Sequence, residues 1–279
     1  MALKFGVSLP NGHHPAELVR FAVELEQAGW DGFFLWDHVQ LDPGRREPTY
    51  DPWVQLGAIG AHTERLRLGT LVTPVPRRRP WKLAKEVVTL DHLTGGRAVL
   101  GVGLGVPPAT EYGAFGEPVE PKLHAARLDE ALPVLDRLLR GEPVDHRGEH
   151  YQVSAELLPG SVQRPRPPIW VAAMLPARAG VRRAARWDGI VPQSRDTGPL
   201  TPEALAALVA ELPQRSLSLS KGKPDDHDEP RFDVVTPLAD HAPADELADA
   251  GATWGIDGPR HREETFAETR ARLLAGPPR

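Results

Sequence analysis

The chain has no cysteine among its 279 residues and no long apolar run. The lack of cysteine excludes disulfides, thiolate chemistry and metal sites with cysteine ligands. A helix that spans a bilayer needs about 18 consecutive apolar residues, and no apolar run of this sequence reaches that length. The first residues lead directly into strand-like sequence, without the apolar core of a signal peptide. We therefore expect a cytoplasmic protein that is not embedded in a membrane.

The sequence also has no strong excess of charge of either sign. It contains 33 Lys and Arg against 38 Asp and Glu, a formal net charge of −5 and a pI near 6.1. The basic residues are scattered apart from the triplet Arg77-Arg78-Arg79, so nothing predicts binding to nucleic acid or to an anionic membrane. We interpret that triplet as a solvated loop, with a phosphate clamp as the alternative.

Proline and glycine are abundant, at 30 and 26 residues, but they form no periodic repeat. Low-complexity classes are therefore excluded. Instead, short apolar segments alternate with segments of helical periodicity. Strands are expected at residues 4–9, 32–36, 66–72, 98–102, 169–173, 189–191, 232–236 and 253–256. Helices are expected at residues 15–28, 52–63, 81–93, 124–140, 177–187, 202–212, 244–250 and 262–274.

The segment 66–105 shows this alternation most clearly. Prolines end the strand at 66–72, the helix at 81–93 stops at Gly95-Gly96, and a second buried strand follows. A strand–helix–strand unit of this length is typical of a parallel sheet. Repetition of this unit along the chain favours a closed (β/α)8 TIM barrel over an open doubly wound sheet. We expect one domain over 1–279, with an excursion at about 106–168 and a mobile loop at 218–230.

In such a barrel the functional groups follow the carboxyl ends of the strands. Asp37 and His38 come directly after the second strand. A carboxylate there can orient an imidazole that exchanges protons near neutral pH. The alternative is structural, with Asp37 capping the next loop and His38 satisfied by hydrogen bonds. The adjacent His13 and His14 point in different directions, so we expect no metal site and assign His13 to the substrate side.

Glycines at 101, 103 and 105 close the fourth strand and allow a ligand to approach its backbone. Their spacing matches neither a phosphate-binding loop nor a dinucleotide fingerprint. Relief of crowding inside the barrel is the alternative explanation. Glu111 and Tyr112 follow a few residues later, which makes this loop a second candidate region of the site.

Motifs along almost the whole chain resemble one known family. They are KFGVSLP at 4–10, WDH at 36–38, DPW at 51–53, TERLRLGTLVTPVPRRRPWKLAKEVVTLDHLTGGRAVLGVGLG at 63–105, EYGAFGEP at 111–118, PPIWVAA at 167–173, DGIVPQ at 188–193 and AGATWGIDG at 250–258. In this order they resemble the bacterial luciferase-like flavin-dependent monooxygenases and their deazaflavin-dependent relatives, and the block at 63–105 is the most specific. The resemblance implies a (β/α)8 barrel that holds a flavin at the carboxyl ends of its strands.

The resemblance also implies roles for individual residues. His38 would give or take a proton beside the flavin ring, and Asp37 would fix its orientation. Thr70 and Leu71 match a strand-three bulge, often with a non-prolyl cis peptide, that supports the face of the ring. Further cofactor contacts are implied for Gly103, Gly105, Glu111, Ala172 and Ala173. Substrate contacts are expected from His13, Tyr50 and Tyr112.

One departure from the family concerns the loop after the fourth strand. Strictly deazaflavin-dependent dehydrogenases resemble this chain but carry a glutamate directly after the strand-four glycines. This sequence has Val106-Pro107-Pro108 there, and Glu111 is the nearest carboxylate. The choice between FMN and deazaflavin therefore stays open at this point.

The resemblance implies an oxidoreductase. We expect a monooxygenase that uses non-covalent reduced FMN, supplied by a separate flavin reductase, and O2 as paired donors toward a small organic substrate. The first alternative is hydride transfer with the deazaflavin coenzyme F420, and the second is a flavin-binding homologue without turnover. A metal-dependent barrel hydrolase or lyase is a rival from another class. A homodimer is expected by likeness to the family.

Overall fold

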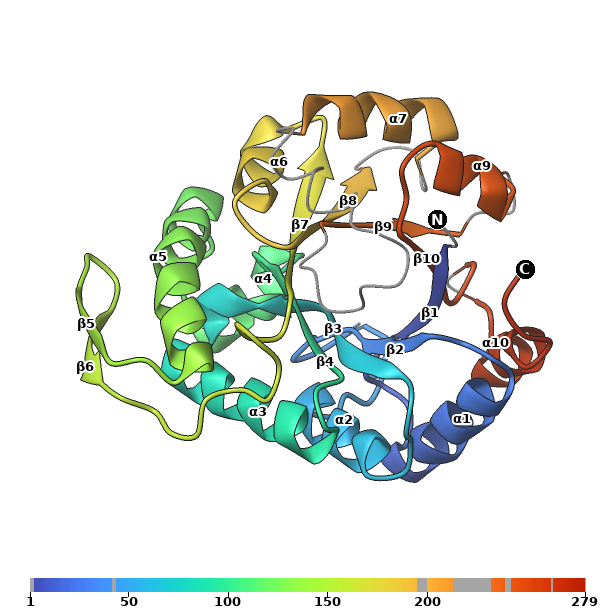
Figure 1. The fold of residues 1–279 in the computed structure, drawn as a ribbon, viewed down its shortest axis with the longest axis horizontal. Helices are drawn as coiled ribbons and strands as arrows, with labels where there is room; N and C mark the ends of the chain where they lie inside the picture. Colours follow the sequence, from blue (N-terminus) through green and yellow to red (C-terminus); the bar gives the residue numbers. More distant parts are fainter. Residues whose placement is uncertain are drawn as a thin grey trace. The chain divides into compact units, whose positions relative to one another are not determined.

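The computed structural model describes residues 3–41, 44–194, 200–212, 232–238, 242–261 and 263–278. Within them, parallel strands form a closed barrel in the order β1-β10-β9-β8-β7-β4-β3-β2 (Figure 1). These strands are β1 (Lys4–Leu9), β2 (Gly32–Leu35), β3 (Arg67–Pro74), β4 (Ala98–Gly103), β7 (Ile169–Leu175), β8 (Gly189–Ser194), β9 (Asp233–Pro237) and β10 (Trp254–Asp257). The expected (β/α)8 barrel is confirmed, and the open sheet is excluded because a closed barrel has no edge strand.

Proline positions explain where many of the helices begin. A proline at the first helical position has no amide hydrogen to leave unpaired, and its φ angle is already helical. The helices that begin on a proline are α1 (Pro15–Gln27), α2 (Pro52–Gly60), α3 (Pro80–Leu93), α4 (Pro108–Glu111), α5 (Pro121–Arg140) and α7 (Pro202–Glu211). The other helices within the described residues are α6 (Arg178–Ala184), α9 (Ala244–Asp249) and α10 (Phe266–Leu273).

The chain divides into two compact units. The terminal unit comprises Met1–Ser8, Glu24–Phe33 and Pro168–Arg279, and the central unit comprises Leu9–Val23 and Phe34–Pro167. The expectation of one domain stays a prediction. In the terminal unit, β10 pairs with β1 and β9, and β8 pairs with β7 and β9. The Trp30 indole of this unit donates to Leu273 O at 2.9 Å, which attaches α10.

In the central unit, β3 and β4 pair in parallel, and α3 packs against β4 and α5 (Figure 1). α5 buries the leucine stripe that its periodicity predicts. Its buried leucines are Leu128, Leu132, Leu135, Leu138 and Leu139.

The expected excursion after β4 contains α4, a 3₁₀ turn (Gly113–Phe115), α5 and an antiparallel hairpin of β5 (Val144–Arg147) and β6 (Gln152–Ala155). Figure 1 shows this hairpin projecting beyond α5. The Glu130 carboxylate of α5 accepts from His150 N at 3.0 Å and Tyr151 N at 2.8 Å, and it contacts His146 Nε2 at 3.0 Å. Burial alone would raise the pKa of Glu130, but these bonds, led by that of His146, lower it. The carboxylate thereby fastens the hairpin to α5.

The expected elements all occur, with ends that differ by a few residues. The difference that matters for the site is β3, which was expected to stop before Pro74. It continues because the pairing with β4 shifts between Thr70 and Thr73, after which Thr73 pairs with Val102 and Pro74 with Gly103. Proline is tolerated in a strand next to such a bulge. The loop expected at 218–230 lies outside the described residues.

Candidate functional site

His38 follows β2, and its backbone is held by Asn11, which follows β1. The Asn11 amide donates to His38 O at 2.8 Å and to Tyr50 O at 2.7 Å, and its oxygen accepts from His38 N at 3.4 Å. Asn11 is fully buried, so each of these bonds is made away from water. The main chain of His38 is therefore fixed independently of its side chain.

The imidazole of His38 contacts the carboxylate of Glu111, which lies at the end of α4. The distance from His38 Nδ1 to Glu111 Oε1 is 2.7 Å. The Glu111 side chain is completely buried, whereas that of His38 is 25% exposed. An ionised carboxylate can only accept, so Nδ1 carries the hydrogen and Nε2 keeps its lone pair. Within the described residues, Nε2 makes no hydrogen bond, which leaves it available to a proton of a substrate.

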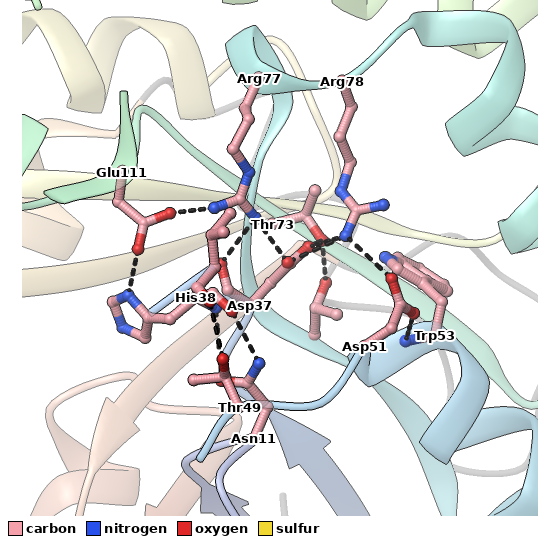
Figure 2. Close-up of polar contacts among 12 residues, drawn as sticks. Asn11, Asp37, His38, Thr49, Asp51, Trp53, Thr73, Arg77, Arg78 and Glu111 are labelled. Carbon is pink, nitrogen blue, oxygen red and sulfur yellow. Dashed lines mark hydrogen bonds and ion pairs between the residues drawn. The ribbon is translucent and has the colours of Figure 1, made fainter. Parts of the chain in front are cut away.

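Arg77, in the 3₁₀ turn (Val75–Arg77) after β3, joins two buried carboxylates (Figure 2). Its Nη1 donates to Glu111 Oε2. Its Nη2 donates to Asp37 Oδ1 at 2.7 Å and to the main-chain oxygen of Asp37 at 3.1 Å. The Arg77 side chain is only 11% exposed. A single guanidinium thus connects the residue before His38 with the partner of the His38 ring.

Arg78 holds the same aspartate from a second direction. Its Nη2 donates to the two oxygens of Asp37 at 2.9 and 2.8 Å, and its Nη1 donates to Glu86 on α3 at 3.1 Å. Burial disfavours the charge of Arg78, but the contacts with Asp37 raise the pKa of its guanidinium. The expectation of a solvated arginine loop is thus wrong for Arg77 and Arg78, because buried carboxylates draw both side chains inward. Arg79 is exposed, as expected.

The Asp37 carboxylate binds the guanidinium groups of Arg77 and Arg78 and does not contact the imidazole of His38. Besides both guanidinium groups, it accepts from the Thr73 hydroxyl at 2.8 Å. This differs from the expectation that Asp37 orients His38, since Glu111 makes that contact. The two buried carboxylates of Asp37 and Glu111 thus face the two guanidinium groups of Arg77 and Arg78.

The bulge of β3 lies next to this cluster. Leu71 and Val72 fall between the paired positions Thr70 and Thr73, and the Leu71–Val72 peptide is cis. Thr70 is buried and donates to Gly101 O at 3.2 Å, whereas Leu71 and Val72 are half-buried. Thr70 and Leu71 therefore lie at the bulge, and their contact with a cofactor ring stays a prediction.

The loop after β4 is closed by Tyr112. Its hydroxyl donates to Leu104 O at 2.6 Å, and its ring stacks on His124 at 3.9 Å between centroids. Gly105 has a φ of +84°, and a Cβ there would lie 2.9 Å from the Tyr112 ring. Tyr112 is fully buried, and this burial raises the pKa of its hydroxyl above the usual range. In this arrangement Tyr112 supports the loop from inside, which differs from the expected contact with substrate.

The remaining predicted residues are more scattered. His13 is half-buried, and burial lowers the pKa of its imidazole despite the opposing charge of Glu17. Tyr50 is 36% exposed and meets the ring of His14 edge-on at 6.3 Å. The other predicted positions are Gly103, at the buried end of β4, and Ala172 and Ala173, on β7 of the terminal unit.

The structure adds members that the sequence pattern did not single out as site residues. They are Asn11, Thr73, Arg77 and Arg78. The available signal was that Asn11, Arg77 and Arg78 follow the ends of strands, as Asp37 and His38 do, whereas Thr73 lies within β3. Among the described residues, no group of three or more His, Cys, Asp or Glu is placed to hold a metal ion, and no helix is long and apolar enough to cross a membrane.

Known proteins share this fold and sequence pattern. An F420-dependent glucose-6-phosphate dehydrogenase from Microbacterium testaceum is 33% identical over 210 residues, which cover 74% of this chain and 61% of the relative. The chain spans about half to three fifths of the length of the curated relatives that it matches.

Solved structures resemble the whole chain at low sequence identity. The coenzyme F420-dependent tetrahydromethanopterin reductase from Methanopyrus kandleri has a TM-score of 0.74 and 18% identity, with 100% of this chain and 98% of that chain covered. The monooxygenase RslO1 from Streptomyces bottropensis has a TM-score of 0.68 and 23% identity, with 98% of both chains covered. At these identities the similarity shows the fold alone. The family described as luciferase-like monooxygenase matches residues 3–238, and the chain belongs to this family of oxidoreductases.

Proposed function

We propose that the protein binds coenzyme F420 and transfers a hydride between this deazaflavin and a small organic substrate that carries a hydroxyl or carbonyl group. The observation that carries the proposal is the buried carboxylate of Glu111, 2.7 Å from His38 Nδ1. Oxidation of an alcohol needs a base for the hydroxyl proton while the hydride leaves the carbon. The His38 imidazole fits that requirement, because Nδ1 is bonded to Glu111 and Nε2 can accept a proton.

The residues around the β3 bulge fit a planar conjugated ring. Leu71 and Val72 are half-buried, although Thr70, Thr73 and Pro74 beside them are buried, so they form an apolar surface at the carboxyl end of the strand. When bound, F420 supplies the hydride acceptor or donor. The chain's own part is to hold the ring at this surface and to present His38 Nε2 to the substrate.

The steps that fall to the protein are proton steps. His38 Nε2 takes the hydroxyl proton in the oxidation direction and returns it to the carbonyl oxygen in the reverse direction. Glu111 accepts from Nδ1 and stabilises the imidazolium that forms. Asn11 and Arg77 hold the backbone on either side of His38, so the ring is pre-positioned before the substrate binds.

A second candidate function is that of an FMN-dependent monooxygenase, as expected from the sequence. A separate reductase would then supply the reduced FMN. The match to the luciferase-like monooxygenase family favours it. The same site would then act on a flavin in the presence of O2. The similarity to F420-dependent dehydrogenases supports the first candidate, because the relative from Microbacterium testaceum aligns with 74% of this chain.

Titration with each cofactor separates the two candidates. Purified protein is titrated with F420 and with FMN, each oxidised and reduced, and binding is followed by fluorescence and absorbance. We expect saturable binding of F420 and, without oxygen, reduction of F420 by an alcohol from a substrate panel. Binding of FMN without binding of F420 would overturn the proposal, and so would turnover that requires O2. His38→Gln, with F420 binding retained and turnover lost, is the matched control for the role of the imidazole.

A further inference from the structure

Arg77 contacts both the carboxylate of Glu111 and the main chain of Asp37, the residue before His38. We propose that Arg77 is a positioning residue that keeps Glu111 an ionised acceptor and thereby holds His38 with its hydrogen on Nδ1. The catalytic meaning of this inference rests on the proposed function. Its geometry and its test do not require a cofactor.

The two oxygens of Glu111 have different partners, and this determines where a proton can lie. Oε2 faces Arg77 Nη1, and Oε1 faces His38 Nδ1. A proton on Oε2 would meet a guanidinium hydrogen, and arginine cannot lose its own proton in a protein. A proton on Oε1 would have His38 Nδ1 as its acceptor. With Arg77 in place, the stable arrangement is therefore an ionised Glu111 and a hydrogen on Nδ1.

The surrounding charges do not replace Arg77 in this role. Arg78 is the next cation, but its bonds go to Asp37 and Glu86 rather than to Glu111. The Tyr112 hydroxyl is directed to Leu104 O. The charged and titratable groups around the pair are Asp37, Arg77, Arg78, Glu86 and Tyr112, with Asp51 at 3.9 Å from Arg78.

Arg77 also fixes the distance between the partners. The bond from Nη2 to the main-chain oxygen of Asp37 holds the residue before His38, while Nη1 holds Glu111. These two bonds connect the segment after β2 to α4. Removal of Arg77 therefore removes a nearby positive charge and a mechanical link at once.

The loss of Arg77 has a definite effect on the hydrogen of the imidazole. Without Arg77, Oε2 of Glu111 has no guanidinium beside it, and this oxygen can carry a proton. A neutral carboxyl group is a weaker acceptor for Nδ1–H than a carboxylate, so the neutral imidazole is no longer held with its hydrogen on Nδ1.

The test is 15N NMR of the histidine side chains in the full chain without cofactor. His38→Gln identifies the His38 signals by their loss. In the wild-type protein we expect the neutral form to carry its hydrogen on Nδ1. In Arg77→Gln we expect the preference for Nδ1–H to weaken and the Nε2–H form to gain population.

Two further variants keep this test specific. Arg77→Lys retains the charge but reaches fewer acceptors, so its change in the tautomer of His38 is smaller and in the same direction. It also serves as the test if Arg77→Gln does not fold. Arg166→Gln removes another buried guanidinium of the central unit, whose Nε lies 2.7 Å from Asp136. We expect this control to lower stability without changing the tautomer of His38.

The outcomes separate this inference from the proposed function. Unchanged His38 signals in both Arg77 variants would overturn the role of Arg77, as would an equal shift in Arg166→Gln. Failure of the wild-type protein to bind F420 would instead overturn the proposed function. In that case a changed tautomer of His38 in Arg77→Gln would still support the positioning role.

Discussion

The substitution Asp37→Asn tests whether the arginine–carboxylate cluster stabilises the fold. Asparagine has the same shape but no charge, and one of its terminal atoms becomes a donor. Asp37 is 3% exposed and accepts from Arg77, Arg78 and Thr73. In the variant, Arg77 and Arg78 therefore each lose a charged acceptor. The new NH2 group also faces groups that are themselves donors.

The expected cost follows from the burial of the partners. Removal of one member of a buried ion pair costs about 3–5 kcal/mol, because the remaining charge stays buried without compensation. The unfolding entropy of a chain of 279 residues is about 0.6 kcal/mol/K at about 2.1 cal/mol/K per residue, so the melting temperature should fall by about 5–9 °C. The side chains of Arg77 and Arg78 are 11% and 16% exposed, so the cost expected for a buried ion pair applies to them.

Thermal and urea unfolding, followed by circular dichroism, measure this cost. Glu24→Gln is the matched control, because it removes the carboxylate of a more exposed pair with Arg270 in the terminal unit. The control should cost less than about 1 kcal/mol. A loss for Asp37→Asn no larger than that of the control would refute the reasoning and would mean that the cluster is solvated.

Three other substitutions give independent tests. Glu111→Gln should lower turnover about 100-fold with little change in cofactor affinity, because the imidazolium of His38 loses the negative charge that stabilises it; steady-state kinetics with unchanged turnover would contradict this. Tyr112→Phe should cost about 1–2 kcal/mol in urea unfolding, because Leu104 O loses a buried donor, and a tenfold rise in KM would place the ring against the substrate after all. Burial lowers the pKa of His13 from its usual value of 6.5, so the unfolded state binds the proton first as the pH falls. Stability should therefore decline below about pH 6.5, less steeply in His13→Asn, and equal slopes for the two proteins would contradict the assignment.

Much of the fold could be predicted because local signals agree along the chain. Residues 98–103 are apolar and buried throughout, and Gly95 and Gly96 take positive φ angles where the preceding helix was expected to stop. The end of β3 could not be predicted, because prolines normally mark the end of a strand. The bulge that lets Pro74 stay in the sheet depends on the pairing with β4, which the local sequence does not contain.

The site was predictable in position but not in its contacts. His38 follows a strand end, which a barrel directs to the functional face. Its partner Glu111 lies 73 residues later on a helix of four residues, too short to show any periodicity. Charged runs in loops are usually solvated, so the sequence predicts solvent-exposed side chains for Arg77 and Arg78. Their burial depends on carboxylates that only the folded chain brings near them.

The two bonds from Asn11 to His38 O and Tyr50 O enclose the stretch from 39 to 49 between fixed ends. Thr49 adds a closure of its own, because its hydroxyl donates to Val39 O at 2.7 Å. Exchanges inside this stretch should therefore leave the main chain of His38 in place, because Asn11 holds it from outside the stretch.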